Sequence, residues 1–225
     1  MFKSFKSVLC IVPILFCFFQ TAYSQKVTIT TTPQTAKIYV NGVAMGAGQL
    51  VVTVPSKACV TVEIREEGSI PEIRTYCRKK GISAPPKADY FQLQPDESYT
   101  SSLQSDIANN EIVLNVKKGR TRDDAWKIIV ATVLGKFDVL ENNDEKSGYL
   151  RTSWVGSTFK TNTVRMRVII KLSTDDPLSY KIKFISEYSG KSGTAFNADE
   201  QYHPFNRILK KYDGFLEELS TKLKN

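Results

Sequence analysis

Residues that could carry out catalysis are few in this 225-residue sequence, which contains a single histidine, His203. A histidine that acts as a general base needs a nucleophile and an orienting carboxylate within reach, and no motif in the sequence supplies that set. His203 directly precedes Pro204, which suits the first turn of a helix, so we expect it to mark a helix start. The sequence therefore predicts a protein that is not an enzyme and has no catalytic residues, metal site or cofactor.

Two short motifs that could hold a substrate are better explained by local structure. Asp123 and Asp124 follow Thr121, which is a good helix N-cap, and the helix dipole favours carboxylates in the first turn. A catalytic carboxylate pair would want a third partner, and none is evident. Gly46 and Gly48 lie among β-type segments, without the strand-to-helix context of a phosphate loop, so we interpret them as turn residues.

Basic residues lie on one side of a predicted β-hairpin, Val164–Tyr188, and form a candidate binding site: Arg165, Arg167, Lys171, Lys181 and Lys183. With the turn centred on Asp175, Arg167 lies opposite Lys183, and like charges in that arrangement repel. Such a patch could hold an anionic partner, such as an envelope glycan, a lipid phosphate or an acidic protein surface. The alternative is a solvated face on which Glu187, diagonal to Arg165, relieves the repulsion.

The other side of this hairpin is apolar, because its residues alternate with the basic ones at the period of a half-buried strand. The predicted register gives three apolar cross-strand pairs: Val168–Ile182, Met166–Phe184 and Ile170–Tyr180. We expect Pro204–Leu223 to cover that side as one long helix. Its apolar residues recur at helical spacing: Phe205, Ile208, Leu209, Tyr212, Phe215, Leu216, Leu219 and Leu223.

Ahead of this hairpin the sequence predicts a strand at Glu111–Val116, a helix that ends at Leu134 before Gly135, and a hairpin over 137–155. The order β-α-β-β-β-β-α describes an antiparallel sheet with helices on one face, an α+β architecture. Trp126 and Trp154 could line a ligand cleft between the sheet and the C-terminal helix. Packing in the core is the commoner role for such residues.

Spaced aromatic and small residues run through this region: Asp124-Ala125-Trp126, Phe137-x-Val139, Asn143-Asp144 and Gly148-Tyr149-Leu150-x-Thr152-x-Trp154. Over residues 111–154 this pattern resembles the helix-grip domain of BamC-type outer-membrane assembly lipoproteins. The resemblance implies protein–protein contact at the outer membrane. The chain departs from that family because bulky Leu9 and Phe16 precede Cys10 and Cys17, so no lipidation motif is present.

The first half consists of short β-branched segments separated by Gly, Pro and Asn, which predicts an all-β domain of hairpins. Asn41-Gly42 gives the strongest turn signal, since a type I′ turn needs positive φ at both central residues. The run TPQTAKIYVNGVAMGAG, followed by a Val-rich strand, resembles the PEGA family of envelope-associated β-sandwich modules over about Val27 to Gly68. The four-residue motif after which the family is named reads Pro33-Gln34-Thr35-Ala36 in this chain. The resemblance implies a non-catalytic adaptor.

Two cysteines follow the N-terminal leader, Cys59 and Cys77. In a hairpin centred on Gly68 they lie directly opposite each other, and residue 61 pairs with residue 75. We therefore predict a disulfide, which fits an oxidising compartment and an even cysteine count. A metal or redox site is the alternative, but it lacks a nearby histidine or third cysteine.

The predicted organisation is a signal peptide (1–24), a PEGA-like β-sandwich (25–94), a flexible linker (95–110) and a helix-grip-like α+β domain (111–225). Lys3 and Lys6 precede an apolar run from Val8 to Phe19 and a small-residue cleavage site, which is the signature of a secretory leader. That run is shorter than the roughly 20 residues that span a bilayer. We therefore expect a soluble protein, exported to the periplasm or cell surface, with no transmembrane anchor after cleavage.

After removal of the leader, 29 basic and 23 acidic residues remain, a net charge of +6. These charges are spread out, which argues against nucleic acid as a partner. The leading hypothesis is a non-enzymatic cell-envelope protein that acts as a binding or adaptor module for a protein or glycan, with peripheral membrane contact allowed. The alternative is a carrier of a small apolar ligand, with a groove between the sheet and the C-terminal helix.

Overall fold

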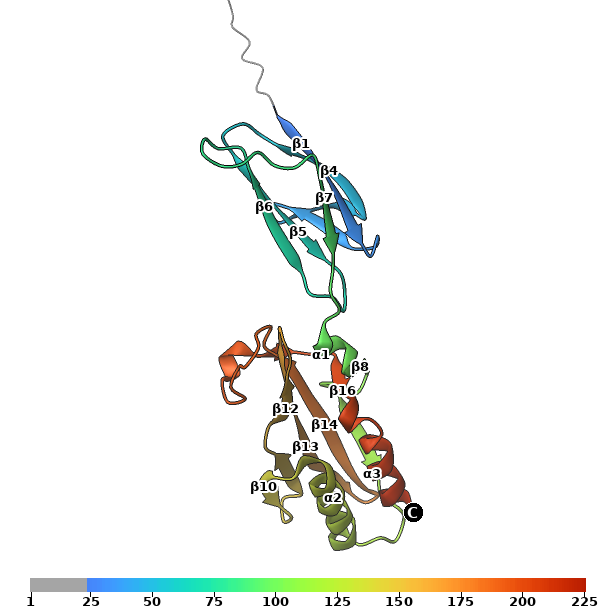
Figure 1. The fold of residues 1–225 in the computed structure, drawn as a ribbon. Helices are drawn as coiled ribbons and strands as arrows, with labels where there is room; N and C mark the ends of the chain where they lie inside the picture. Colours follow the sequence, from blue (N-terminus) through green and yellow to red (C-terminus); the bar gives the residue numbers. More distant parts are fainter. Residues whose placement is uncertain (1–23) are drawn as a thin grey trace, which may run out of the picture. The chain divides into compact units, whose positions relative to one another are not determined.

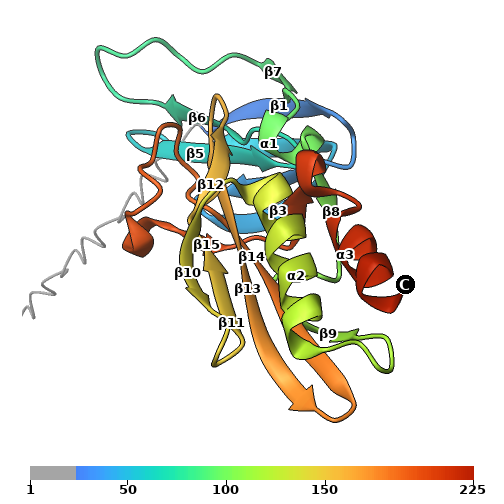
Figure 2. The same ribbon diagram turned by 90° about the horizontal axis from the view of Figure 1, so that it is seen from below.

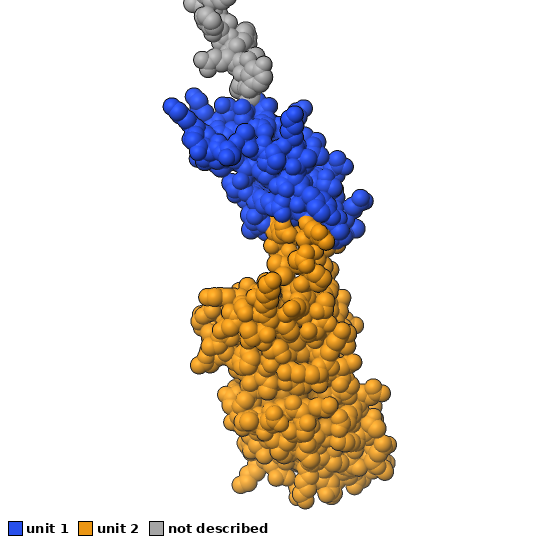
Figure 3. Space-filling model, viewed as in Figure 1, with its two compact units in different colours: residues 1–64, 73–91 blue, residues 65–72, 92–225 orange. Residues whose placement is uncertain are grey.

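The computed structural model describes residues 24–225 and shows a mostly β protein with a helix at its C-terminus (Figure 1). The predicted leader, apart from Ser24, lies outside the described residues. The described chain forms two compact units (Figure 3). The first holds the described residues up to Ile64 together with Ile73–Phe91, and the second holds Arg65–Glu72 and Gln92–Asn225.

The first unit contains two sheets, which are built mostly from the short segments that the sequence predicts. One sheet has the order β4-β1-β7, with β1 at Gln25–Thr32, β4 at Gln49–Val54 and β7 at Ala88–Gln92. The other has the order β3-β2-β5-β6, with β2 at Lys37–Val40, β3 at Val43–Ala47, β5 at Cys59–Arg65 and β6 at Glu72–Cys77. Strand β3 was not predicted, because its exposed residues do not alternate.

Two local predictions for this unit are confirmed. Asn41 and Gly42 join β2 to β3 with φ values of 49° and 82°, as a type I′ turn requires. Cys59 and Cys77 form a disulfide. The Thr61 and Thr75 hydroxyls lie 3.1 Å apart, which matches the cross-strand pairing predicted for the β5–β6 hairpin.

The second unit is organised around a seven-stranded sheet with the order β10-β11-β13-β14-β15, in which β12 also pairs with β13 and β9 with β14. Its strands are β9 (Glu111–Asn115), β10 (Leu140–Asp144), β11 (Tyr149–Thr152), β12 (Val155–Thr158), β13 (Thr163–Asp175), β14 (Leu178–Tyr188) and β15 (His203–Pro204). Helices α2 (Arg122–Phe137) and α3 (Phe215–Lys224) lie against one face of this sheet (Figure 2). The core therefore lies between that face and the two helices.

Helix α2 begins as predicted and ends later than predicted. The Thr121 hydroxyl accepts a hydrogen bond from the Asp124 amide, and both aspartates lie in the exposed first turn. The expected stop at Gly135 is wrong, because the helix continues to Phe137. Phe137 is fully buried between the rings of Tyr212 and Phe215, so its burial outweighs the local preference of glycine for a helix end.

The predicted long helix Pro204–Leu223 is wrong over its first half. His203 and Pro204 form β15 instead of a helix start, β16 covers Arg207–Leu209, and α3 spans only Phe215–Lys224 after Gly214 at φ 74°. Strand β16 pairs with β8 (Ser102–Gln104), which satisfies its backbone groups without a helix. The apolar side chains are nevertheless buried as expected: Ile208, Leu209, Tyr212, Phe215, Leu219 and Leu223.

Residues 95–110, predicted to be a flexible linker, are folded into the second unit. They contain α1 (Glu97–Thr100), which is capped by Asp96, and strand β8. Arg207 Nε on β16 donates to the Ser102 hydroxyl at 2.8 Å, and the Asp96 amide donates to the carbonyl of Gly68. The polar composition of this segment supplies caps and cross-strand contacts, so the linker prediction is wrong.

Candidate functional site

The β13–β14 hairpin has a register two residues away from the predicted one. Val168 pairs with Phe184, Ile170 pairs with Ile182 and Arg167 lies opposite Ile185, not Lys183. The difference arises because the turn consists of Asp176 and Pro177 and a bulge falls between Leu172 and Thr174. Since side chains alternate with a period of two, the shift leaves every residue on its predicted face and changes only its partner.

Arg165 is buried, with 2% of its side chain exposed, and it is not part of an open basic patch as predicted. Glu187 lies directly opposite it and bonds its guanidinium at 2.6 Å, and Asp199 does so at the same distance. The guanidinium also donates to the carbonyl of Phe196. Two carboxylates therefore neutralise Arg165, which removes it from the set of available cations.

Aromatic rings and guanidinium groups alternate in a stack on this side of the sheet. The Arg165 guanidinium carbon lies 3.9 Å from the ring centroids of both Tyr202 and Trp154, and the Arg167 carbon lies 4.0 Å from the centroid of Trp154. Tyr202 and Asp199 belong to the segment 189–202 that follows β14, here called the strap. Gly156 on β12 is required here, because a Cβ there would overlap the carbonyl oxygen of Val164 and would lie 2.8 Å from the Phe196 ring of the strap.

The stack contradicts the predicted cleft between Trp126 and Trp154. Trp126 is buried in the core on the helix side, with its ring centroid 5.9 Å from that of Tyr180, whereas Trp154 lies on the opposite face of the sheet. The chain leaves the strand geometry between Thr152 and Val155, and both of these residues point toward the core side. The alternation is therefore interrupted, and Trp154 points outward.

The face of the seven-stranded sheet that points away from the helices is the outer face. Its open part, here called the basic face, carries five cations: Arg151, Arg167, Lys171, Lys181 and Lys183. Two carboxylates serve four of them. Glu141 lies 2.9 Å from Arg151 and 3.8 Å from Arg167, and Glu111 lies 3.5 Å from Lys171 and 3.7 Å from Lys181. Within the described residues Lys183 has no ion pair, although it lies opposite Glu111 in the ladder. The face therefore has a charge excess of three.

The cations of the basic face repel one another. Lys171 and Lys181 lie directly opposite each other, an arrangement that is unfavourable on a sheet. Desolvation by burial, followed by the nearby charge of Arg151, lowers the pKa of Arg167 from its ordinary value. Among residues 24–225, no hydrogen-bond partner is present for the buried Nε atoms of Arg151 and Arg167. Sequence reasoning missed Arg151, although its position in the alternation of β11 could have indicated it.

Apolar side chains lie between these cations. Ile169 is paired with both Arg151 and Lys183 across three neighbouring strands, and Val113, paired with Lys181, is 53% exposed. Helices α2 and α3 pack on the other face. The basic face is thus a broad surface with an apolar centre and a cationic periphery.

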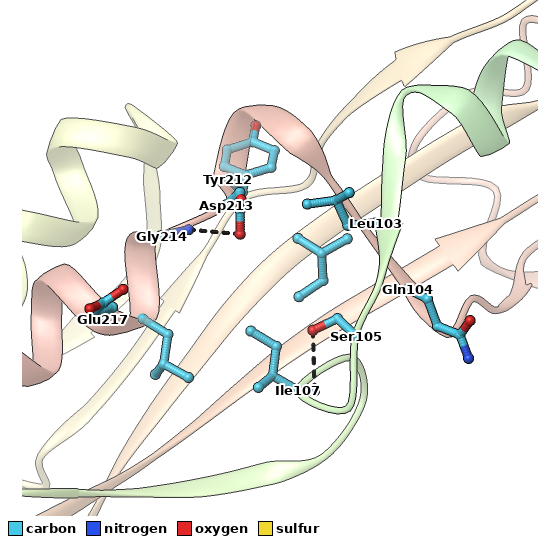
Figure 4. A pocket seen from close by; sticks show the side chains of 10 residues that line it. Leu103, Gln104, Ser105, Ile107, Tyr212, Asp213, Gly214 and Glu217 are labelled. Carbon is cyan, nitrogen blue, oxygen red and sulfur yellow. Dashed lines mark hydrogen bonds between the residues drawn. The ribbon is translucent and has the colours of Figure 1, made fainter.

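The second predicted feature, a groove under the C-terminal helix, is filled. Phe215, Leu219 and Leu223 of α3 are fully buried against the sheet. A hollow of about 260 Å³ lies instead at the start of α3 (Figure 4). Figure 4 shows Leu103 and Ile107 pointing into it from the β8 side, with Asp213 and Glu217 on the α3 side.

Other chemistry is sparse in the described part of the chain. No group of three or more His, Cys, Asp or Glu side chains lies close enough to hold a metal ion among residues 24–225. None of the helices in that range is long and apolar enough to cross a membrane. His203 is exposed, and its ring centroid lies 6.1 Å from that of Tyr188.

Comparison with known proteins adds no identity, because no family model and no curated protein matches this chain. The mostly β fold, the C-terminal helix and the Cys59–Cys77 disulfide are therefore what the chain itself establishes.

Proposed function

We propose that this protein is a non-enzymatic binding module of the cell envelope, and that its basic face binds an acidic surface of a protein partner. The observation that carries the proposal is the charge excess of three on a sheet face that the helices leave uncovered. Cationic surfaces steer and orient acidic partners, and buried apolar area at the centre supplies affinity.

The composition of the basic face supports a protein partner over a glycan. Protein interfaces combine an apolar centre with a polar rim and are enriched in Arg and Tyr. Ile169 and Val113 provide the apolar part here, Arg151 and Arg167 lie beside it, and Tyr149 is paired with Lys171. A glycan site would instead need a concave surface rich in hydrogen-bonding groups.

The proposal includes a fold assignment for each unit. The two sheets of the first unit would correspond to the two layers of a PEGA-like sandwich that serves as spacer or adaptor. The sheet of the second unit, with α2 and α3 on one face, would correspond to a helix-grip-like domain with a shorter C-terminal helix than that family pattern implies. The disulfide supports export, since disulfides persist in oxidising compartments.

A pull-down from envelope extract tests the proposal. Wild-type protein is compared with a variant in which Lys171, Lys181 and Lys183 are all changed to Gln. We expect the wild type to capture a protein at low salt, to lose it as the ionic strength rises, and to capture at least tenfold more of it than the variant.

The matched control changes three exposed lysines on the helix side, Lys127, Lys136 and Lys224, to Gln. It carries the same net charge as the test variant, so it separates a local surface from overall charge. Equal capture by the two variants would mean that the basic face is only a solvated surface.

The alternative function is a carrier of a small apolar ligand, which would now use the hollow at the start of α3. Its volume of about 260 Å³ lies just below the 300–1,000 Å³ range of most ligand sites. Leu103, Ile107, Ile208 and Leu216 give it an apolar lining. A fluorescent fatty-acid probe that binds the wild type, but not a Leu216→Glu variant, would favour this function.

A further inference from the structure

Another hollow lies in the second unit at a junction of three chain segments. Its volume is about 370 Å³, which falls within the range of about 300–1,000 Å³ that is usual for small-ligand sites. Its lining comes from the end of α1, the end of β12 and the connection from β16 to α3: Thr100, Ser101, Ser157, Phe159, Leu209, Lys210 and Lys211. No residue of the basic face lines it, so it is a separate site.

Hydrogen bonds hold the three segments around the hollow. The Lys210 amide donates to the carbonyl of Ser101 at 3.0 Å, which joins the β16 side to α1. The Lys211 ammonium donates to the carbonyl of Gly156 at 3.1 Å, which joins it to β12 beside Ser157. The backbone of Lys210 and the side chain of Lys211, which are neighbours in one 3-10 turn, are therefore held to two different segments of the rim.

The charge around the hollow is positive and unbalanced. Its lining contains two lysines and no carboxylate, and neither lysine has an ion pair in the described part of the chain. Nearby, Arg207 is 8% exposed and, in the described part of the chain, donates only to neutral acceptors, the hydroxyl and carbonyl of Ser102 and the carbonyl of Tyr99. A buried guanidinium without a carboxylate adds to the field that an anion would experience.

The remaining lining groups suit a polyhydroxylated ring. The hydroxyls of Ser101 and Ser157 make no hydrogen bond within residues 24–225, so both are available as donors and acceptors. Phe159 and Leu209 contribute apolar surface to the same hollow. Free hydroxyls beside an aromatic ring can bind the edges and the face of a sugar ring at the same time.

The geometry points to a binding site for a monosaccharide-sized ring that carries a phosphate or carboxylate group. Lys210 and Lys211 bind the anionic group, Ser101 and Ser157 bind ring hydroxyls, and Phe159 packs against the ring. This site is independent of the proposed protein partner, because it uses none of the same residues.

Titrations of the purified protein with glucose 6-phosphate, inorganic phosphate and glucose test this assignment, with backbone amide shifts recorded by NMR. We expect saturable shifts at Ser101, Ser157 and Lys210 with glucose 6-phosphate. Inorganic phosphate and glucose should each bind at least about tenfold more weakly, because each lacks one part of the recognised ligand. Lys210→Gln should weaken glucose 6-phosphate binding by about tenfold or more, as is typical for loss of a charge-assisted hydrogen bond.

Lys136→Gln is the matched control, since it removes the same charge from an exposed position on α2, outside both proposed sites, and should leave glucose 6-phosphate binding unchanged. Lys210 is exposed, so its variant is expected to keep the wild-type amide spectrum elsewhere. Absence of saturable shifts at the lining residues, or equal binding by Lys210→Gln and the wild type, would overturn the assignment. Inorganic phosphate binding as tightly as glucose 6-phosphate would overturn the saccharide part of it.

Discussion

Arg165 and Glu187 face each other across β13 and β14, and Arg165 Nη2 lies 2.6 Å from Glu187 Oε2. The arginine is almost fully buried, whereas the glutamate side chain is 21% exposed and Asp199, on the strap, is 77% exposed. The ion pair between Arg165 and Asp199 thus joins the sheet to the strap at the surface. A residue that looked like an exposed binding cation is a structural element of the outer face.

Arg165→Met should destabilise the second unit, because it leaves Glu187 without its partner in a partly buried position. Removal of one member of a buried ion pair costs about 3–5 kcal/mol. The Arg165→Met/Glu187→Leu double variant should recover most of that loss, since the one carboxylate then left unpaired, Asp199, is 77% exposed and is solvated. Urea unfolding measures both, and a cost below about 1 kcal/mol for the single variant would contradict the role assigned to Arg165.

Glu111→Gln should have effects of opposite sign on stability and on binding. Glu111 lies between Lys171 and Lys181, which repel each other across the ladder. Its loss should reduce the free energy of unfolding by about 0.2–1 kcal/mol. The same change raises the charge excess of the basic face, so capture of an acidic partner should increase. If stability and capture fall together, the basic face does not bind through its charge.

Cys59→Ala should destabilise the first unit. The two cysteines are 18 positions apart, and closure of a loop of this size contributes about 3 kcal/mol in the chain-entropy account. Calorimetry of Cys59→Ala and of the Cys59→Ala/Cys77→Ala double variant would measure the loss. The double variant, which has no free thiol, separates the missing cross-link from thiol side reactions.

Limited proteolysis should spare residues 95–110 in the native protein, since α1 and β8 are folded there. Arg207→Ala removes three hydrogen bonds to Tyr99 and Ser102 and should open this segment. Chymotrypsin should then cut after Tyr99 or Leu103 at least several-fold faster than in the wild type. Lys224→Ala is the control with the same loss of charge. Rapid cutting of the native protein at these sites would restore the linker interpretation.

Alkaline pH should weaken the second unit through Tyr212. Burial raises the pKa of Tyr212 from 10.0 to about 12. Below pH 10 the phenol is neutral in both states, and its contribution to stability is complete. Between those two values the unfolded state releases the proton first, so the contribution is lost as the pH rises. Tyr212→Phe should therefore lose less stability than the wild type between pH 10.0 and about pH 12, and parallel curves would contradict this.

Features that depend on neighbouring residues could be predicted from the sequence. The Asn41-Gly42 turn, the Thr121 cap and the alternating faces of β13 follow from local backbone and side-chain preferences. The register of the β13–β14 hairpin could not be predicted, because a shift of two residues conserves the same apolar pattern. The positions of Asp176 and Pro177 in the turn decide between these registers, and the apolar pattern contains no information about them.

Features that depend on distant segments were mispredicted. Ile208, Tyr212, Phe215 and Leu219 have helical spacing, and nothing near them in sequence indicates that β16 pairs with β8. The burial of Arg165 was hidden for a similar reason, since its carboxylate and aromatic partners lie on other strands and on the strap. Alternation identifies the face of a side chain, but it does not show what covers that face.

The β8–β16 pairing also sets the order in which the second unit can fold. Ser102 and Arg207 are 105 positions apart, and the strands between them must be arranged before this pair can form. Contacts of such long sequence separation slow folding, because loop-closure entropy is lost before the contact forms. Because synthesis begins at the N-terminus, β8 would stay unpaired until nearly all of this unit had been synthesised. The unit should therefore fold late and slowly, after most of its chain has been synthesised.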